Sequence, residues 1–318
     1  MKAIQVEAPG LFTTVQDLGR EGFGPLGVSP SGAADPISLR LGNRLVGNPD
    51  NAAALEMTLL GGTFLFPEGA VLALSGSDFG ATIDGVGVDP WMSFEALPGQ
   101  TARLGPTRSG ARSYLCVEGG MAVRPFLGSA STHALSGLGG FEGRALRKGD
   151  VLSIANASQP YRRLTIAPYI LSRLSPRKIL RCTPGPQSEW FPESSQNLFY
   201  NSTYRVAEDS NRMGLRLDGP AIPVSSSGHM ITEGVSLGAI QVPGGGSQII
   251  SSPIILFVEQ QTTGGYPKIA NVISADLPSV GQLRPRDEIR FEQVSFETAG
   301  ALLREQEALL ASQELIQE

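Results

Sequence analysis

The stretch that decides the expected fold is Glu233-Gly-Val-Ser-Leu-Gly-Ala-Ile-Gln-Val-Pro243, together with the loop Gln260-Gln-Thr-Thr-Gly-Gly-Tyr-Pro-Lys268 further along the chain. Between them, residues 249–258 form an apolar run that is rich in β-branched residues and has no helical period. This run predicts one or two buried strands, interrupted near Ser251-Ser252-Pro253. A buried strand therefore leads into a loop of amides, hydroxyls, glycines and one lysine.

Two interpretations of this loop stay open from its residues alone. Its glycines can adopt a positive φ and bring backbone N–H groups close to a ligand, and Lys268 would add a positive charge to those donors. The simpler alternative is a tight turn in which the Thr and Gln side chains cap the turn's own backbone.

Length and composition predict a mainly β protein. The chain has 318 residues, of which 41% are apolar, with 39 glycines and 23 prolines. These counts indicate real cores, many turns and short strands with a few helices. We expect an N-terminal domain over residues 1–160 and a C-terminal domain over residues 175–318, which ends in a helix.

Several classes of protein are disfavoured by the same data. The net charge of −5 provides no basic stripe for nucleic acid. No apolar run approaches about 18 residues, and the N-terminus lacks the apolar segment of a signal peptide. Cys116 and Cys182 form neither a metal spacing nor a disulfide framework. The expectation is a reduced, cytoplasmic protein without membrane contact.

The coarse order of elements follows from local signals. Asp35 as N-cap and Pro36 at the first position predict a helix that ends at Gly47. We expect a linker over residues 156–177, with one strand at 163–166, and a final helix over residues 296–317. Alternating apolar residues predict short strands at residues 4–8, 55–60, 64–66, 71–74, 102–104 and 113–117.

Four small motifs recur in the same order on both sides of the linker. The pairs are Pro9-Gly10 with Pro184-Gly185, Asp17-x-x-Arg20-x-Gly22 with Asp209-x-x-Arg212-x-Gly214, Glu56-x-x-x-Leu60-Gly61 with Glu233-x-x-x-Leu237-Gly238, and Leu146-Arg147-x-x-Asp150-x-Leu152 with Leu283-Arg284-x-x-Asp287-x-Ile289. They favour two copies of one β-rich unit, each closed into a barrel that hides its sheet edges. The alternative is coincidence and shared turn chemistry.

Familiar catalytic motifs are missing from the sequence. His133 and His229 have no zinc-site context, so no metal site is predicted, and no P-loop is present. Carboxylates, arginines and amides in glycine-rich loops could bind a carboxylate- or bicarbonate-like anion, with a glutamate as acid or base. They are Gln16, Asp17, Arg20, Ser31, Asp35, Glu56, Glu118, Arg144, Glu233, Gln241, Gln261, Thr262, Thr263 and Lys268. Asp17–Arg20 and Asp209–Arg212 are better interpreted as structural ion pairs.

The chain resembles the family of allophanate hydrolase subunit 2, also called KipA-like or biotin-dependent carboxyltransferase proteins. The motifs that carry the resemblance are residues 9–20 (PGLFTTVQDLGR), 27–36 (GVSPSGAADP), 42–48 (GNRLVGN), 55–56 (LE), 118–120 (EGG), 127–129 (LGS), 140–144 (GFEGR), 233–234 (EG), 238–243 (GAIQVP) and 261–267 (QTTGGYP). The resemblance implies two cyclophilin-like β-barrels. The sequence departs from the family pattern at two places. Before the Gln-Thr-Thr loop it has Glu259-Gln260 where the family often has Asp-Gly or Asp-Arg, so a carboxylate is kept. Near the end it has Pro285-Arg286-Asp287 where the family usually has Pro-Gly-Asp, which changes a turn.

The family implies three functions that the sequence does not separate. The first is a subunit of a bacterial ATP-dependent 5-oxoprolinase, working with a KipI-like subunit (PxpB) and a LamB/YcsF-like subunit (PxpA), so that ATP acts through the complex. The second is the carboxyltransferase of a urea carboxylase-type system, with biotin on a partner and no cofactor covalently bound here. The third is a KipA-like regulatory protein.

We expect the catalytic residues to be Glu233, Lys268 and Glu118. Arg20, Lys268 and the backbone of Gly264-Gly265 would bind the substrate's carboxylate, while Glu233 or Glu118 would transfer a proton. The predicted substrate-binding residues are Gln16, Arg20, Gln241, Gln261, Thr262, Thr263, Gly264 and Gly265.

Overall fold

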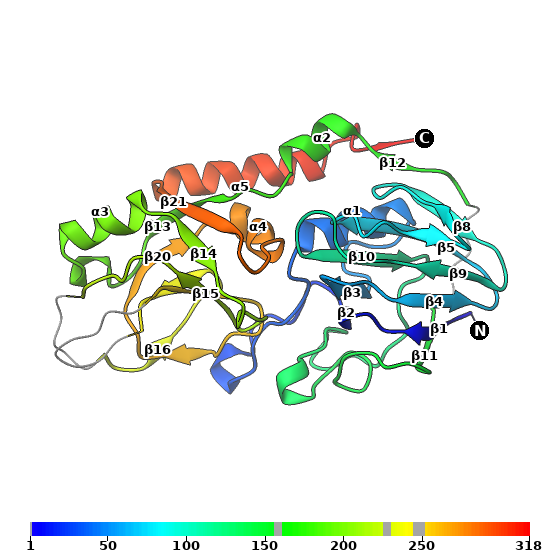
Figure 1. The fold of residues 1–318 in the computed structure, drawn as a ribbon, viewed down its shortest axis with the longest axis horizontal. Helices are drawn as coiled ribbons and strands as arrows, with labels where there is room; N and C mark the ends of the chain where they lie inside the picture. The colour runs from blue at the N-terminus through cyan, green and yellow to red at the C-terminus, as the bar shows by residue number, and fades with distance from the viewer. Residues whose placement is uncertain (1, 156–160, 225–229, 244–251) are drawn as a thin grey trace. The chain divides into compact units, whose positions relative to one another are not determined.

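The computed structural model describes residues 2–155, 161–224, 230–243 and 252–318, and it confirms the mainly β fold class (Figure 1). The chain forms two compact units. Unit 1 contains Met1–Arg20, Ser31–Leu174 and Ala311–Glu318. Unit 2 contains Glu21–Pro30 and Ser175–Leu310. His229 and part of the predicted apolar run, residues 249–251, lie outside the described residues.

Unit 1 is built from two antiparallel sheets. The six-stranded sheet has the order β11 (Val151–Ser153), β1 (Ala3–Ala8), β4 (Thr63–Phe66), β9 (Gln100–Arg103), β6 (Thr82–Ile83) and β7 (Val86–Gly87). The five-stranded sheet has the order β2 (Phe12–Gln16), β3 (Ala54–Thr58), β10 (Arg112–Val117), β5 (Ala70–Gly76) and β8 (Ser93–Ala96). One apolar core draws on both sheets, because alternate residues of each strand point into it.

The helix α1 (Pro36–Leu45) packs on β5 and β10 of the five-stranded sheet, as Figure 1 shows. The predicted start is confirmed, because the carboxylate of Asp35 accepts a hydrogen bond from the backbone N–H of Ser38 at 3.0 Å. Ile37, Leu41 and Leu45 are buried on the face that meets the sheet. Gly47 follows with a φ of +73°, which suits the end of a helix.

Unit 2 contains a closed seven-stranded barrel. Its order is β13 (Ile179–Pro184), β20 (Lys268–Val272), β17 (Ala239–Gln241), β18 (Ile254–Leu256), β15 (Gly214–Asp218), β14 (Tyr204–Val206) and β21 (Glu288–Gln293). The parallel pair of β13 and β21 closes the barrel, and the other neighbours are antiparallel. A two-stranded ribbon of β16 (Glu233–Gly234) and β19 (Thr263–Gly264) accompanies it. β18 confirms a strand in the described part of the apolar run.

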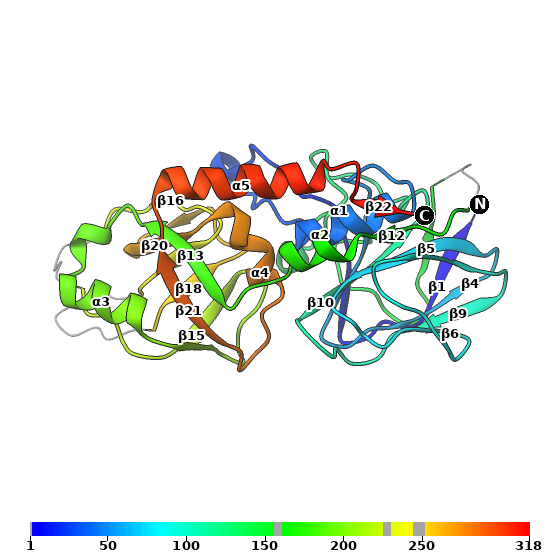
Figure 2. The ribbon, with the colours of Figure 1, turned by 90° about the horizontal axis from the view of Figure 1, so that it is seen from above.

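The remaining elements are short, apart from α5 (Phe296–Leu310), which lies beside β13 (Figure 2). The prediction that this helix extends to residue 317 is wrong. After Ser312, whose carbonyl and hydroxyl bind following backbone N–H groups, the chain extends into β22 (Ile316–Gln317). The other helices are η1 (Gly24–Leu26), η2 (Ala134–Ser136), α2 (Pro168–Arg173), η3 (Ser188–Trp190), α3 (Glu193–Asn201), η4 (Ser274–Asp276) and α4 (Leu277–Gly281).

The predicted linker contains more structure than its composition indicates. The expected strand is present as β12 (Thr165–Ile166), which pairs with β22 in unit 1. The helix α2 follows it, starting at Pro168, and was not predicted from the sequence. Pro168 occupies the first helical position, where its missing N–H has no cost. Residues 156–160 lie outside the described part of the chain.

One of the recurring motifs forms the same turn in both units. In unit 1 the carboxylate of Asp150 accepts from the backbone N–H of Arg147 at 2.7 Å. In unit 2 the carboxylate of Asp287 accepts from the backbone N–H of Arg284 at 2.9 Å. Gly149, with a φ of +91°, and Arg286, with a φ of +72°, occupy the same position in these turns. This repeat is therefore structural as well as sequential.

Within the described residues, no helix combines the length and the apolar character needed to cross a membrane. Cys116 and Cys182 are buried free thiols, and burial raises the pKa of each.

Candidate functional site

Two strand pairs of unit 2 bring four of the predicted site residues together. In the ribbon, Glu233 lies opposite Gly264, and in the barrel, Gln241 lies opposite Lys268. Glu233 and Lys268 then meet through their side chains, with 2.6 Å between the Glu233 Oε1 and the Lys268 Nζ. Strand pairing therefore gathers residues that are up to 35 positions apart in the sequence.

The ion pair of Glu233 and Lys268 is asymmetric in its exposure. The side chain of Lys268 is 2% exposed, whereas that of Glu233 is 42% exposed. A buried ammonium needs a compensating charge, and here that charge lies where solvent or a small molecule can reach it. The Lys268 ammonium, and next the Gln187 amide, lower the pKa of Glu233. Glu233 is therefore ionised at neutral pH.

Gln187 is a member of this site that sequence reasoning missed. Its Nε2 donates to the Glu233 Oε1 at 2.9 Å, and its Oε1 accepts from the backbone N–H of Lys268 at 3.2 Å. Gly185 allows the approach, because a Cβ there would lie 2.2 Å from the carbonyl oxygen of Lys268. The Pro184-Gly185 motif lies nearby, but nothing local marks Gln187, which is 46 positions from Glu233.

The side chain of Gln241 is buried at 1% exposure, and its Nε2 has no hydrogen-bond partner among the described residues. Buried amide nitrogens are normally bonded, so this unused donor is an uncommon feature. It lies on the strand next to Lys268. Among the predicted binding residues, Gln241 therefore has the clearest unused hydrogen-bond donor.

The loop after β18 is joined to Val235, the residue after β16, by two hydrogen bonds. The side chain of Gln260 donates to the Val235 carbonyl at 3.1 Å, and the Thr262 carbonyl accepts from the Val235 N–H at the same distance. Both bonds join the loop to another segment rather than to its own backbone, and the ligand-binding interpretation of the loop stays a prediction. Gln261 and Thr263 are exposed, while Thr262 and Gly265 are partly buried. Gly264 is buried.

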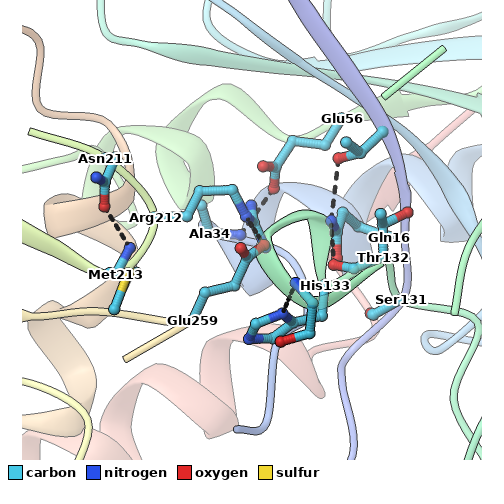
Figure 3. A network of polar contacts seen from close by, with 12 residues as sticks. Gln16, Ala34, Glu56, Ser131, Thr132, His133, Asn211, Arg212, Met213 and Glu259 are labelled. Carbon is cyan, nitrogen blue, oxygen red and sulfur yellow. Dashed lines mark hydrogen bonds and ion pairs between the residues drawn. The ribbon is translucent and has the colours of Figure 1, made fainter. Parts of the chain in front are cut away.

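The other three predicted residues belong to unit 1. The Gln16 amide donates to the Thr132 carbonyl at 3.1 Å (Figure 3). The buried guanidinium of Arg20 donates to the Ser131 carbonyl at 2.5 Å. The same guanidinium lies over the ring of Phe126. Glu118 follows β10 and is partly buried. The contacts of Gln16 and Arg20 hold loops together, and the ligand roles of all three remain predictions.

The predicted ion pair of Asp209 with Arg212 is wrong. Arg212 pairs with Glu259 at 2.5 Å, with both side chains at most 7% exposed (Figure 3). Asp209 pairs with Arg216 at 3.1 Å on the surface of the unit. The error arises because Arg212 points inward, to a residue 47 positions away, whereas sequence proximity favoured its neighbour.

Asp17, expected to pair with Arg20, accepts hydrogen bonds from the hydroxyls of Ser129 and Ser131 and from the backbone N–H of Ala130. Asp17 and Arg20 are both tied to the segment of residues 126–131.

His133 caps a short turn, because its Nδ1 accepts from the backbone N–H of Ser136 (Figure 3). In the part of the chain that the structure describes, no group of three or more His, Cys, Asp or Glu side chains is arranged to bind a metal ion.

The chain is similar to known proteins along nearly its whole length. It is 36% identical over 297 residues to the 5-oxoprolinase C subunit of Haemophilus influenzae and 38% identical over 296 residues to that of Escherichia coli. Both alignments cover 93% of this chain and 93% of the relative. The crystal structure of the Kluyveromyces lactis urea amidolyase is also similar, with a TM-score of 0.89 and 34% identity. That alignment covers 96% of this chain but 19% of the much longer amidolyase.

The family described as "Carboxyltransferase domain, subdomain A and B" matches residues 26–293. Because this match covers most of the chain, and because the two bacterial 5-oxoprolinase relatives align over nearly their full length, the protein belongs to the family of carboxyltransferase domains with subdomains A and B.

Proposed function

We propose that this protein is a subunit of an ATP-dependent 5-oxoprolinase, a complex that hydrolyses the lactam of 5-oxo-L-proline to L-glutamate. The observation that carries the proposal is the alignment with two 5-oxoprolinase C subunits over 93% of both chains. The alignments cover nearly the whole of each 5-oxoprolinase C subunit, whereas the similarity to the amidolyase covers 19% of that longer chain.

We assign the candidate site of unit 2 to the substrate of that complex. Glu233 is ionised, half exposed and fixed by Lys268 and Gln187, so it can accept a hydrogen bond from a bound substrate, and we keep it as the candidate for proton transfer although its lowered pKa makes it a weak base. Lys268 holds that carboxylate in place and supplies a positive charge beside it. Gly264 lies opposite Glu233 and Gln241 opposite Lys268, and we propose that these two bind the substrate together with Gln261, Thr262, Thr263 and Gly265 of the same loop, while Glu118, Gln16 and Arg20 stay candidates from unit 1.

ATP is assigned to the complex rather than to the site of unit 2. A triphosphate needs several free donors and cations, but the Lys268 ammonium is already matched by Glu233, and the sequence has no P-loop. The partners would be a KipI-like subunit (PxpB) and a LamB/YcsF-like subunit (PxpA). We place the complex in the cytoplasm, where Cys116 and Cys182 stay reduced.

The test is to co-express this chain with those two partners and to measure glutamate released from 5-oxo-L-proline with and without ATP. We expect release only when all three chains and ATP are present. Lys268→Ala should abolish turnover while the complex still co-purifies, because the variant loses the charge that fixes Glu233. Lys148→Ala, at an exposed lysine, is the control. Full activity without this chain would refute the proposal.

A second candidate is the carboxyltransferase of a biotin-dependent carboxylase. The structural match to the urea amidolyase, at a TM-score of 0.89, supports it. The only Met-Lys in the sequence is Met1-Lys2, so biotin, which carries the carboxyl group in such systems, would be attached to a partner. Binding of the chain to a biotinylated carrier protein, together with urea-dependent consumption of carboxybiotin, would favour this candidate over the first.

A further inference from the structure

Gly264 packs closely against the side chains of two glutamines. A Cβ placed on Gly264 would lie 2.7 Å from the Gln241 Nε2, 3.2 Å from a methyl group of Val235 and 3.5 Å from the Gln261 Nε2. Two amide nitrogens therefore converge on the position that a side chain at residue 264 would occupy. Of these, the Gln241 Nε2 is buried and makes no hydrogen bond within the described structure.

The backbone does not explain why residue 264 is a glycine. Gly264 lies in an extended strand, and its φ is outside the positive range that only glycine adopts easily. Alanine would be compatible with that conformation but would press on the Gln241 amide. The absence of a side chain thus leaves room for the Gln241 amide, whose buried Nε2 donor has no hydrogen-bond partner within the described structure, at a cost in stability.

We propose that Gln241 and Gln261 form a subsite for one uncharged carbonyl oxygen, with Gly264 as its floor. A carbonyl oxygen accepts two hydrogen bonds, which matches two amide donors. A carboxylate suits the place less well, because the neighbouring Lys268 charge is already balanced by Glu233, whose own negative charge would repel a second one. The inference rests on the proposed function only for the name of the ligand, which would be the lactam carbonyl of 5-oxo-L-proline.

The geometry also gives the ligand a direction. Glu233 lies opposite Gly264 in the ribbon and is ionised, so it can accept a hydrogen bond from an N–H group. A lactam presents its C=O and N–H on the same side of the ring, because the ring holds its amide in the cis form. The carbonyl would meet the two glutamines, and the N–H would face Glu233. L-Proline keeps the ring and the carboxylate but lacks the carbonyl, and its ring nitrogen is a charged ammonium that ionised Glu233 would attract. A preference for 5-oxo-L-proline over L-proline would therefore come from the carbonyl and not from attraction to Glu233.

The experiment measures the affinity of the purified full-length chain for 5-oxo-L-proline, L-proline and urea by calorimetry. We compare the wild type with Gly264→Ala, which fills the subsite, and with Gln241→Glu, which keeps the shape but replaces a donor by an acceptor. Gly234→Ala is the control, because it lies in the same ribbon and a Cβ there meets nothing within 4 Å. Circular dichroism checks that each variant is folded.

We expect the wild type to prefer 5-oxo-L-proline over L-proline by at least about tenfold, and both site variants to lose that preference. Gly234→Ala should keep it. If urea is the compound that binds, and Gly264→Ala abolishes that binding, the carbonyl subsite stands and the proposed substrate is wrong. The subsite itself is refuted if neither carbonyl compound binds the wild type more tightly than L-proline does. It is also refuted if the folded variants Gly264→Ala and Gln241→Glu bind these compounds as the wild type does. In either case the Gln241 donor would bind water only.

Discussion

The buried ion pair of Arg212 and Glu259 gives a sharp test of the structure of unit 2. Both side chains are at most 7% exposed. Arg212→Met would leave the Glu259 carboxylate buried without its charged partner, which costs about 3–5 kcal/mol of unfolding free energy. The matched control is Arg216→Met, because the pair of Arg216 with Asp209 is 58% and 68% exposed. Loss of such a surface pair costs at most about 1 kcal/mol.

The assay follows each unit separately by tryptophan fluorescence. The sequence has two tryptophans, Trp91 in unit 1 and Trp190 in unit 2. In a Trp91→Phe background, Trp190 therefore reports the urea or thermal unfolding of unit 2. A loss of 3–5 kcal/mol corresponds to a fall in midpoint of about 6–20 °C for a unit of this size.

Two results would refute this reasoning. One is an Arg212→Met variant that loses no more stability than Arg216→Met. The other is an Asp209→Asn variant that loses as much as Arg212→Met, which the pairing expected from sequence requires. A further check is the double variant Arg212→Met with Glu259→Leu, which should recover part of the loss, because no buried charge is then left alone.

Three other predictions address single residues. Lys268→Met should raise the pKa of Glu233 more than Gln187→Leu does, since the Lys268 contact is the larger cause of its lowered pKa. Ionised Glu233 stabilises the fold fully above its ordinary pKa, and this stabilisation is lost as the pH falls through the lowered folded pKa. In both variants the folded pKa lies closer to the ordinary value, so less stability should be lost and the loss should be complete at a higher pH. A carbon-detected NMR titration of Glu233 measures the order of the three pKa values. Arg286→Gly should be more stable than Arg286→Ala by about 1–2 kcal/mol in urea unfolding, because the φ of +72° strains any residue with a Cβ. Asp35→Ala should cost unit 1 about 0.5–2 kcal/mol and Asp35→Asn less, followed by Trp91, because the alanine removes the cap of α1.

Local signals in the sequence were enough to predict the elements that depend on local physics. The start of α1 follows from Asp35 and Pro36, whose side chains act within one turn. The positions of β3, β4, β5 and β10 follow from alternating apolar residues. The end of α5 could not be predicted in this way, because the apolar residues continue past Leu310 and the chain leaves the helix to pair with β12.

The candidate site was predictable only in part, for a related reason. Glu233, Gln241 and Lys268 stand out because they lie in glycine-rich loops beside strands. Their proximity depends on strand register, which the sequence does not give. Gln187 carries no such signal, and its importance comes entirely from two hydrogen bonds, one to Glu233 in the ribbon and one to Lys268 in β20. The same limit explains why Arg212 was given the wrong partner.

The repeated motif that contains Glu56 in unit 1 and Glu233 in unit 2 has opposite environments in the two copies. Glu56 is 1% exposed and accepts from the Ala34 N–H at 2.8 Å (Figure 3). It also accepts from the Tyr114 hydroxyl at 2.8 Å. A carboxylate so enclosed joins the start of α1 to β10 and has no access to a ligand. Glu233 keeps one charged partner and a half-exposed surface. If the two units are copies, the carboxylate at this position is buried and structural in unit 1, whereas its counterpart in unit 2 is exposed enough to contact a ligand. We therefore assign the site to Glu233 and not to Glu56.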